Sequence, residues 1–278
     1  MRVPKTRFPL SIEKFYARDV QRGVARMENV TMLMLKSEIK PVLNRGIHDA
    51  LIGDDAIDWI ESLIAKLKQL IIGSLTDGDA KDMVNRYIKA IDSSSRNNVA
   101  SQIMAHAKNG TVKLTATVAV PGSKPTVLGV NPVAGDAQLA SYMRGKITEN
   151  VSYITSIRDD YSNKVEQIIY RGVTEGQSYG EMGKAIKHQT HVSRNKASFI
   201  ARDQSGSIYG QMTKRRHQAA GINKFQWETM DDERVRPSHA AREGNIYNYD
   251  TADLLPGEDF NCRCTADPVF DDDDETDD

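Results

Sequence analysis

The chain has 278 residues, of which 39% are hydrophobic, 6% aromatic and 27% charged. This length exceeds one typical domain and predicts two folding units, while the low aromatic content favours helices with large solvated faces over one aromatic-rich core. With only two cysteines, a disulfide framework is excluded. The net charge of −1 depends on seven acidic groups within residues 271–278, because the remaining residues hold 37 basic and 31 acidic groups.

The chain has no apolar stretch that approaches the roughly 18 residues of a membrane span. Its basic N-terminus is not followed by the apolar core of a secretory signal. We therefore expect no membrane segment and expect the protein to be made and assembled in a reducing cytoplasm. The basic start and acidic end are compatible with charged partners, including nucleic acid, or with solvated tails.

The first predicted region, residues 1–108, is helical. Apolar residues recur at spacings of three and four from Pro9 to Ile52, which predicts a long amphipathic helix. Pro41 should bend or divide that helix, because proline removes a backbone donor. Asp54-Asp55 offers a cap for the next helix, which Gly73 should end.

A further helix should follow Asp77-Gly78, and a separate one is predicted from Asn97 to Lys108. Over residues 109–135 the pattern changes, and apolar residues alternate with polar ones from Val112 to Val120. With the Pro/Gly-rich turn that follows, this pattern predicts a β-hairpin near residues 111–130. Such a hairpin would contact a partner or pack as an insert between helices.

Helical periodicity resumes in the third region, residues 136–268, with a helix from Asp136 to Arg171. Ser178 and Glu181 then have the spacing of a capping box, in which each side chain satisfies a backbone donor near the other residue. A short helix is therefore predicted from Tyr179 to His188.

A second helix, capped by Ser193, should run from Arg194 to about Ala220 and end at Gly221. Lys224 to Thr229 is predicted to be a strand, followed by a loop-rich segment and an acidic disordered tail at residues 269–278. The predicted fold is mainly α, with long helices in the N-terminal part and a small α+β, loop-rich C-terminal subdomain.

Basic residues are frequent in the two predicted helices before the strand. A basic helical face can bind the phosphates of double-stranded DNA with salt-dependent affinity and without sequence readout. Ordinary solvated surface is the alternative, and no aromatic residues interleave to stack on bases. The residues concerned are Lys184, Lys187, His188, His191, Arg194, Lys196, Arg202, Lys214, Arg215, Arg216 and His217.

Both cysteines lie near the C-terminus, in a segment rich in Gly, Asp, Asn and Pro. Cys262 and Cys264 are one residue apart, and His239 precedes them by some twenty residues, so the three could reach one metal ion. Alternate side chains of an extended strand lie about 6 to 7 Å apart, so a shared metal would need a tight loop. Zinc would be the expected ion, with a fourth ligand supplied by Asp231, Asp232 or Asp259.

The same residues permit a metal-free interpretation. The cysteines would then be small buried thiols, and Arg234, Arg236, His239 and the aspartates would form a network of ion pairs and hydrogen bonds. Histidine is also a common general acid or base, so a catalytic role for His239 has to be considered. A catalytic cysteine, however, needs an orienting base and an oxyanion site, and neither has a local signature here. We therefore assign no catalytic residues, no cofactor-binding residues and no enzymatic activity.

A succession of short motifs runs through the C-terminal third: Ile200-Ala201-Arg202, Trp227-x-Thr229, Asp232-x-Arg234-Val235-Arg236, His239, Gly244, Pro256-Gly257 and Asn261-Cys262-Arg263-Cys264. Their order and spacing over residues 160–268 resemble the phage head-morphogenesis, or minor head protein, family typified by the F protein of phage Mu. In related proteins the position of Arg236 is often a cysteine, and a histidine often stands near the position of Asp259. This chain lacks those two soft ligands, which favours a structural role for the motif.

The resemblance implies a minor structural protein of a tailed-phage head, assembled in the host cytoplasm and retained in the virion. It implies the portal or the inner capsid as partners, with a role in DNA ejection left open, and it is compatible with a homo-oligomer. One alternative is a toxin-like or nucleotide-processing enzyme that uses the C-terminal module. Another is a non-specific DNA-binding protein, whose binding moderate salt would abolish.

Overall fold

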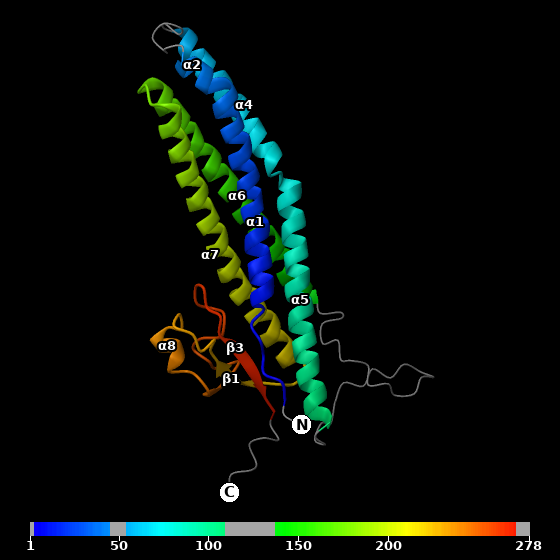
Figure 1. The fold of residues 1–278 in the computed structure, drawn as a ribbon. Helices are drawn as coiled ribbons and strands as arrows, with labels where there is room; N and C mark the ends of the chain where they lie inside the picture. The colour runs from blue at the N-terminus through cyan, green and yellow to red at the C-terminus, as the bar shows by residue number, and fades with distance from the viewer. Residues whose placement is uncertain (1–2, 45–53, 109–136, 271–278) are drawn as a thin grey trace, which may run out of the picture. The chain divides into compact units, whose positions relative to one another are not determined.

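The computed structural model describes residues 3–44, 54–108 and 137–270 (Figure 1). The chain forms two compact units. The sheet unit comprises Met1–Glu13, Tyr87–Lys146 and Arg202–Asp278, and the helical unit comprises Lys14–Arg86 and Ile147–Ala201. The mainly helical fold with a small C-terminal sheet agrees with the sequence-based prediction.

The helices have the following bounds: α1 Leu10–Met34, the π-helical turn η1 Leu35–Ile39, α2 Lys40–Asn44, α4 Asp54–Ser74, α5 Asp77–Lys108, α6 Ala137–Thr174 and α7 Tyr179–Ala219. Parts of α1, α5, α6 and α7 belong to each unit. The segments within the helical unit lie side by side (Figure 1). Hydrogen bonds join its helices, for example from the Tyr16 hydroxyl to Asn150 Oδ1 at 3.1 Å and from Gln21 Nε2 to Ser198 Oγ at 2.8 Å.

The apolar stripes seen in the sequence form the interior of the helical unit. Val24 and Met27 of α1, Ile71 of α4, and Tyr161 and Val165 of α6 are fully buried. Burying such side chains is the main favourable contribution to folding, about 1.5 to 3 kcal/mol for each large aliphatic or aromatic group. The helical periodicity therefore identified the faces that pack.

Pro41 interrupts the first helix less than predicted. The helix continues past it to Asn44, and the irregularity takes the form of the π turn at Leu35–Ile39, directly before the proline. A proline lacks the N–H that would bond to the preceding turn, so that turn is free to widen. Leu35 and Ile39 stay buried.

Two predicted helix boundaries are wrong. α5 runs without a break from Asp77 to Lys108, and α7 runs without a break from Tyr179 to Ala219. Ser193, expected to cap a separate helix, is buried in the interior of α7, and Ser95 of α5 bonds to Thr213 Oγ1 at 3.2 Å. Packing of these polar residues against neighbouring helices overrides their weak helix propensity.

Two helix-end predictions are confirmed. Ser178 N and Oγ both donate to Glu181 Oε2, at 2.8 and 2.7 Å, and Glu181 N donates to Ser178 Oγ at 3.3 Å, which is the reciprocal bonding of a capping box. Gly221 follows the end of α7 with φ +79°, in the left-handed region that favours glycine.

The sheet unit contains three antiparallel strands in the order β2-β1-β3. The central strand β1, Lys224–Glu228, confirms the predicted strand, whereas β2 (Ile246–Asn248) and β3 (Thr265–Val269) lie in the segment expected to be loop. β2 has only three residues and β3 contains a proline, so neither has a clear alternating pattern. Their pairing with β1 depends on long-range contacts that local sequence does not specify.

Phe225 and Trp227 of β1 point into the core of the sheet unit. They cluster there with Tyr249, Leu255, Ala266 and both cysteines. Val269 ends β3, and the ring of Phe270 stacks on His106 at 3.7 Å between centroids, so the start of the predicted tail is ordered against α5. The cysteines are thus part of an aromatic core.

The segment before α1 pairs with β3. Thr6 Oγ1 donates to Ala266 O at 2.7 Å, Thr6 N bonds to Asp267, and Gln102 Nε2 donates to Thr6 Oγ1 at 2.8 Å. Lys5 forms an ion pair with Glu228 of β1 at 2.6 Å. The two ends of the described chain therefore meet in the sheet unit.

The hairpin predicted near residues 111–130 and most of the predicted acidic tail lie outside the described residues. Among the residues that the structure describes, no helix combines the length and the apolar character needed to cross a membrane.

Candidate functional site

Three potential metal ligands converge in the sheet unit. His239 lies on the short helix α8, Pro237–Ala240, where Pro237 occupies the first helical turn. Cys262 and Cys264 lie in the turn that leads into β3. One ligand atom of each residue lies within 4.8 Å of the other two, and all three residues are buried. We call these three residues the Cys/His cluster.

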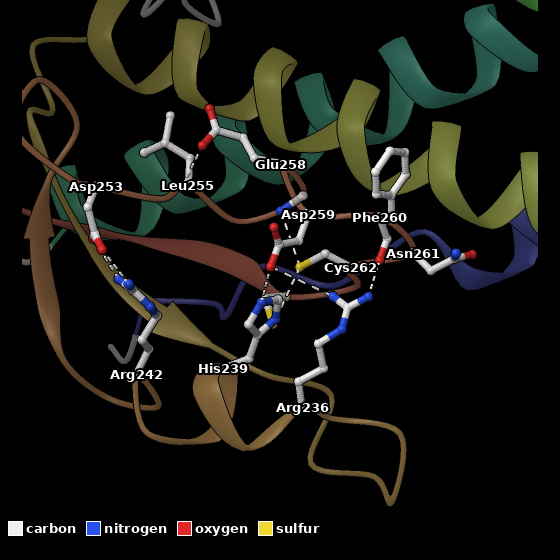
Figure 2. A network of polar contacts seen from close by, with 12 residues as sticks. Arg236, His239, Arg242, Asp253, Leu255, Glu258, Asp259, Phe260, Asn261 and Cys262 are labelled. Atoms are coloured by element: carbon white, nitrogen blue, oxygen red, sulfur yellow. Dashed lines mark hydrogen bonds and ion pairs between the residues drawn. The ribbon is translucent and has the colours of Figure 1, made fainter.

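The two ring nitrogens of His239 have different partners. Nδ1 lies 3.6 Å from Cys262 Sγ and 3.5 Å from Cys264 Sγ, whereas Nε2 lies 2.8 Å from Asp259 Oδ2. Figure 2 shows Asp259 and Cys262 converging on the ring of His239. Asp259 is therefore placed to orient the ring from the side opposite the thiols. The other two proposed fourth ligands, Asp231 and Asp232, are exposed and do not belong to the group of possible metal ligands formed by His239, Cys262 and Cys264.

Several N–H groups approach the sulfur atoms. Gly257 N donates to Cys262 Sγ at 3.4 Å. A hydrogen bond from the Cys264 thiol, with smaller effects of the Gly257 and Cys264 N–H groups and of His239, lowers the pKa of Cys262 against the opposing effect of burial. The same thiol pair and burial raise the pKa of Cys264, while the indole of Trp227 acts in the opposite direction. The environment thus favours one thiolate in the absence of a metal.

A pocket of about 130 Å³ lies beside the Cys/His cluster, and all three residues of the cluster line it. Four arginines line it as well, together with Asp232. The positive charge of these side chains favours an anion or a water molecule over a cation at the mouth. The arginines are Arg202, Arg234, Arg236 and Arg263.

The predicted structural motif is built around the buried Trp227. Its ring meets His239 edge to face, 5.6 Å between centroids, and Arg242 lies 5.4 Å above it. Gly244 N donates to Trp227 O at 2.8 Å, and Gly244 has φ +74°, a conformation that glycine adopts without strain. Thr229 N donates to Glu243 Oε2 at 2.5 Å. These contacts close the loop between β1 and β2.

Asp232 and Arg236, on either side of Val235, have different roles. Asp232 Oδ1 accepts the N–H of Arg234 at 3.0 Å, which shapes the turn before α8. Arg236 Nη2 donates to Phe260 O at 2.5 Å, and Arg236 Nη1 lies 3.8 Å from Asp259 Oδ2. Arg236 therefore ties α8 to the turn before Cys262.

The turn that carries the cysteines docks on α7 through glycines that sequence reasoning missed. A Cβ on Gly206 would overlap the carbonyl of Cys262, and a Cβ on Gly210 would overlap the carbonyl of Pro256. Gly257, with φ +90°, meets the backbone of Gly206 in turn. The spacing of four residues between Gly206 and Gly210 puts both on one helix face, which is the signal that could have identified this contact.

Sequence reasoning also assigned no role to Arg263, which lies between the cysteines. Its Nε and Nη2 donate to Glu13 Oε2 and Oε1, at 2.9 and 2.6 Å. Glu13 is buried, and Arg202 Nε lies 3.8 Å from it. The turn is therefore fastened to the start of α1 as well as to α7.

The basic residues of α7 do not form one face. Arg216 and His217 are fully buried in the sheet unit: Arg216 pairs with Asp92 at 2.5 Å, and His217 Nδ1 lies 2.7 Å from the Tyr249 hydroxyl. In the helical unit, Arg194 pairs with Glu28 at 3.3 Å and Lys196 with Asp160 at 2.6 Å. Lys184, Lys187 and His188 are exposed.

Three curated relatives match this chain over part of its length. An uncharacterized protein of Haemophilus influenzae is 38% identical over 146 residues, which is 48% of this chain and 33% of the relative. A protein of Enterococcus faecalis named NAD(+)–arginine ADP-ribosyltransferase is 30% identical over 131 residues, or 41% of this chain and 27% of the relative. An uncharacterized protein of Methanocaldococcus jannaschii is 30% identical over 118 residues, which is 42% of this chain and 19% of the relative.

The chain thus spans between 19% and 33% of the length of these relatives. No solved structure matches it. The model of the family described as Phage Mu protein F like protein matches residues 163–267, which include all of α7, the strands β1 and β2, the start of β3 and the Cys/His cluster. This agrees with the resemblance inferred from the motifs of residues 160–268. The C-terminal part of the chain, residues 163–267, therefore carries a domain of the Phage Mu protein F like family.

Proposed function

We propose that this protein is a minor structural protein of a tailed-phage head, bound at the portal or the inner capsid surface. The observation that carries the proposal is the match of residues 163–267 to the Phage Mu protein F like family. The motif residues within that range serve packing: Trp227 is buried, Gly244 closes a turn, and Arg236 bonds to a carbonyl. A structural role in a particle is consistent with such contacts.

The test is a deletion in the phage or prophage that encodes the protein. Particles made with and without it would be compared by mass spectrometry, cryo-electron microscopy of the portal vertex, and infectivity. We expect the protein in wild-type particles in a few copies, and we expect its loss to remove density near the portal and reduce infectivity. Supplying the wild-type gene in trans is the control. Deletion particles with unchanged composition and infectivity would overturn the proposal.

Contact with packaged DNA is a finer part of the proposal, supported by exposed basic residues in the first half of α7. Lys184 and Lys187 are exposed and form no ion pair with the other described residues, unlike Arg194 and Lys196. If they contact phosphates, the double change to glutamine should weaken binding to duplex DNA and reduce its salt dependence. The matched control changes Arg194 and Lys196, whose charges already have acidic partners. An equal effect of both pairs would contradict this contact.

An enzymatic alternative comes from the relative that is named an ADP-ribosyltransferase. The matched segment covers only 27% of that protein, so the two chains share a module and not the whole enzyme. Purified protein incubated with labelled NAD(+) and an arginine-containing acceptor tests it directly. We expect no label transfer, and transfer that depends on this protein would replace the structural proposal with an enzymatic one.

A further inference from the structure

The nitrogen-to-sulfur distances in the Cys/His cluster match those of a zinc tetrahedron. Zinc lies about 2.3 Å from a thiolate and about 2.0 to 2.1 Å from an imidazole nitrogen, so at the tetrahedral angle sulfur and nitrogen are about 3.6 Å apart. His239 Nδ1 lies 3.6 and 3.5 Å from the sulfur atoms of Cys262 and Cys264, and all three ligand atoms lie within 4.8 Å of one another. The histidine nitrogen is therefore at the separation from both sulfur atoms that the ion requires.

We infer that His239 Nδ1, Cys262 Sγ and Cys264 Sγ bind one zinc ion, whose fourth position faces the arginine-lined pocket. Each thiol loses its proton when it binds the metal, and no electron is transferred. The fourth position is filled by water or by an anion from solution, because all three ligand residues line the pocket, whereas neither Asp231 nor Asp232 belongs to the ligand group. This inference concerns the isolated chain and is independent of its place in a virion.

Asp259 supports this arrangement as a positioning residue. Its carboxylate lies 2.8 Å from His239 Nε2 and accepts a hydrogen bond when that nitrogen carries the proton, which leaves the Nδ1 lone pair directed at the two sulfur atoms. Metal-bound histidines commonly have such a carboxylate on the other ring nitrogen, and it fixes both the tautomer and the ring orientation. Arg236 Nη1 lies 3.8 Å from the same carboxylate and helps to hold it in place.

Donors around the sulfur atoms supply a second, independent argument. Gly257 N donates to Cys262 Sγ at 3.4 Å. Trp227 Nε1 is buried and has no hydrogen-bond partner among the described residues, and Trp227 shares a buried cluster with Cys264. An N–H group near a sulfur atom stabilises the negative charge that a thiolate carries when it is bound to a metal.

The rigid mounting of the turn favours a preformed site. Gly206 and Gly210 of α7 bring the helix into backbone contact with the turn that carries the cysteines. Arg263, which lies between the two cysteines, binds Glu13. Little ordering is then left to occur when the metal binds. Pre-organisation of this kind increases affinity by reducing the entropy lost on binding.

The first experiment measures metal in the purified full-length protein, prepared without chelator, by elemental analysis. We expect about one zinc per chain, and X-ray absorption should give two sulfur neighbours and two light ones. Replacement by Co²⁺ should produce thiolate-to-cobalt charge-transfer absorption. Folded protein with less than about 0.2 zinc per chain, which also takes up none from added ZnCl₂, would overturn the inference.

Variants then assign the ligands. Cys264→Ser and His239→Ala should lose the stoichiometric zinc, while His188→Ala, at an exposed histidine of α7, should keep it. Because the first two sit in the core and can unfold the sheet unit, Asp259→Asn, at a half-exposed carboxylate, is the sharper test. We expect it to weaken zinc binding by about 10- to 100-fold, as for other residues that orient a ligand. Full zinc affinity in Asp259→Asn, or full zinc content in folded Cys264→Ser, would contradict the assignment.

Discussion

Glu13, in the first turn of α1, accepts two hydrogen bonds from the guanidinium of Arg263, although 250 residues separate them in sequence. Both side chains are nearly buried, with 7% and 12% of their surface exposed. Arg263 also lies over the ring of Phe8, 6.0 Å from its centroid. This pair joins the start of the first helix to the turn that carries the cysteines.

Replacing Arg263 with Met should destabilise the sheet unit by about 3 to 5 kcal/mol, because Glu13 would be left as a buried charge with only a distant partner. Chemical unfolding followed by Trp227 fluorescence, in a Trp59→Phe background, measures the loss. Asp253→Asn is the matched control, since that carboxylate pairs with Arg242 but is 72% exposed, and exposed pairs contribute little. Equal losses in the two variants would contradict the structural role of the Arg263–Glu13 pair.

Gly206→Ala and Gly145→Ala should have opposite effects on stability. Both replace a helical glycine, but a Cβ at Gly206 would overlap the carbonyl of Cys262, whereas nothing lies within 4 Å of a Cβ at Gly145. Overpacking at Gly206 should lower the free energy of unfolding by about 1 to 3 kcal/mol or more. Alanine at Gly145 should raise it by about 0.4 to 1 kcal/mol. Thermal melting of both variants measures the two changes in stability. A higher melting temperature for Gly206→Ala would contradict the close approach of Gly206 to the carbonyl of Cys262.

His217 should make the protein less stable in acid. Burial lowers the pKa of His217 in the folded state to about 3, compared with about 6.5 in an unfolded chain. The unfolded state therefore binds the proton more strongly, so the contribution of His217 is complete above pH 6.5 and is lost as the pH falls from 6.5 toward 3. The upper limit of this loss is about 1.4 kcal/mol per pH unit.

The matched variant for this prediction is His217→Gln, which can still bond to the Tyr249 hydroxyl. Its free energy of unfolding should fall less steeply than that of the wild type between pH 6.5 and 4. Denaturant titrations at a series of pH values measure both slopes. Parallel curves would show that His217 is not buried as a neutral ring.

Arg216 and its neighbour Arg215 should differ in their importance for stability. Arg216 is fully buried and pairs with Asp92 at 2.5 Å, while Arg215 is half-buried and lies 5.6 Å from the ring centroid of Tyr142. Arg216→Met should cost about 3 kcal/mol, because it leaves Asp92 buried with Arg96 as its remaining partner. Arg215→Met should cost clearly less. The comparison uses urea unfolding, and a larger loss for Arg215→Met would be inconsistent with the structure.

Much of the helical architecture followed from sequence alone, because it depends on local signals. The three-and-four spacing of apolar residues identified the packing faces, and Ser178 with Glu181 identified the start of α7. The interior of α7 was mispredicted because Ser193 has the residue type of a cap but is buried against other helices. Local propensity has no information about such burial, so it placed a boundary where tertiary packing continues the helix.

For the candidate site, the sequence identified residue types but not geometry. It selected His239, Cys262 and Cys264 as potential ligands, and the structure brings their ligand atoms within 4.8 Å of one another. It offered three aspartates as equivalent fourth ligands, yet the fold puts Asp259 on the opposite ring nitrogen of His239. Which side of a ring a carboxylate reaches depends on where two distant turns meet.

The sequence by itself determined the helical class, the helix ends marked by capping residues and Gly221, and the family resemblance of residues 160–268. Only the tertiary structure decided that Arg216 and His217 are buried, that Gly206 admits the backbone of the cysteine turn, and that Arg263 binds Glu13. The reason is physical: periodicity and caps act within a few residues, whereas burial and charge pairing bring together segments such as those of Glu13 and Arg263, which are 250 residues apart.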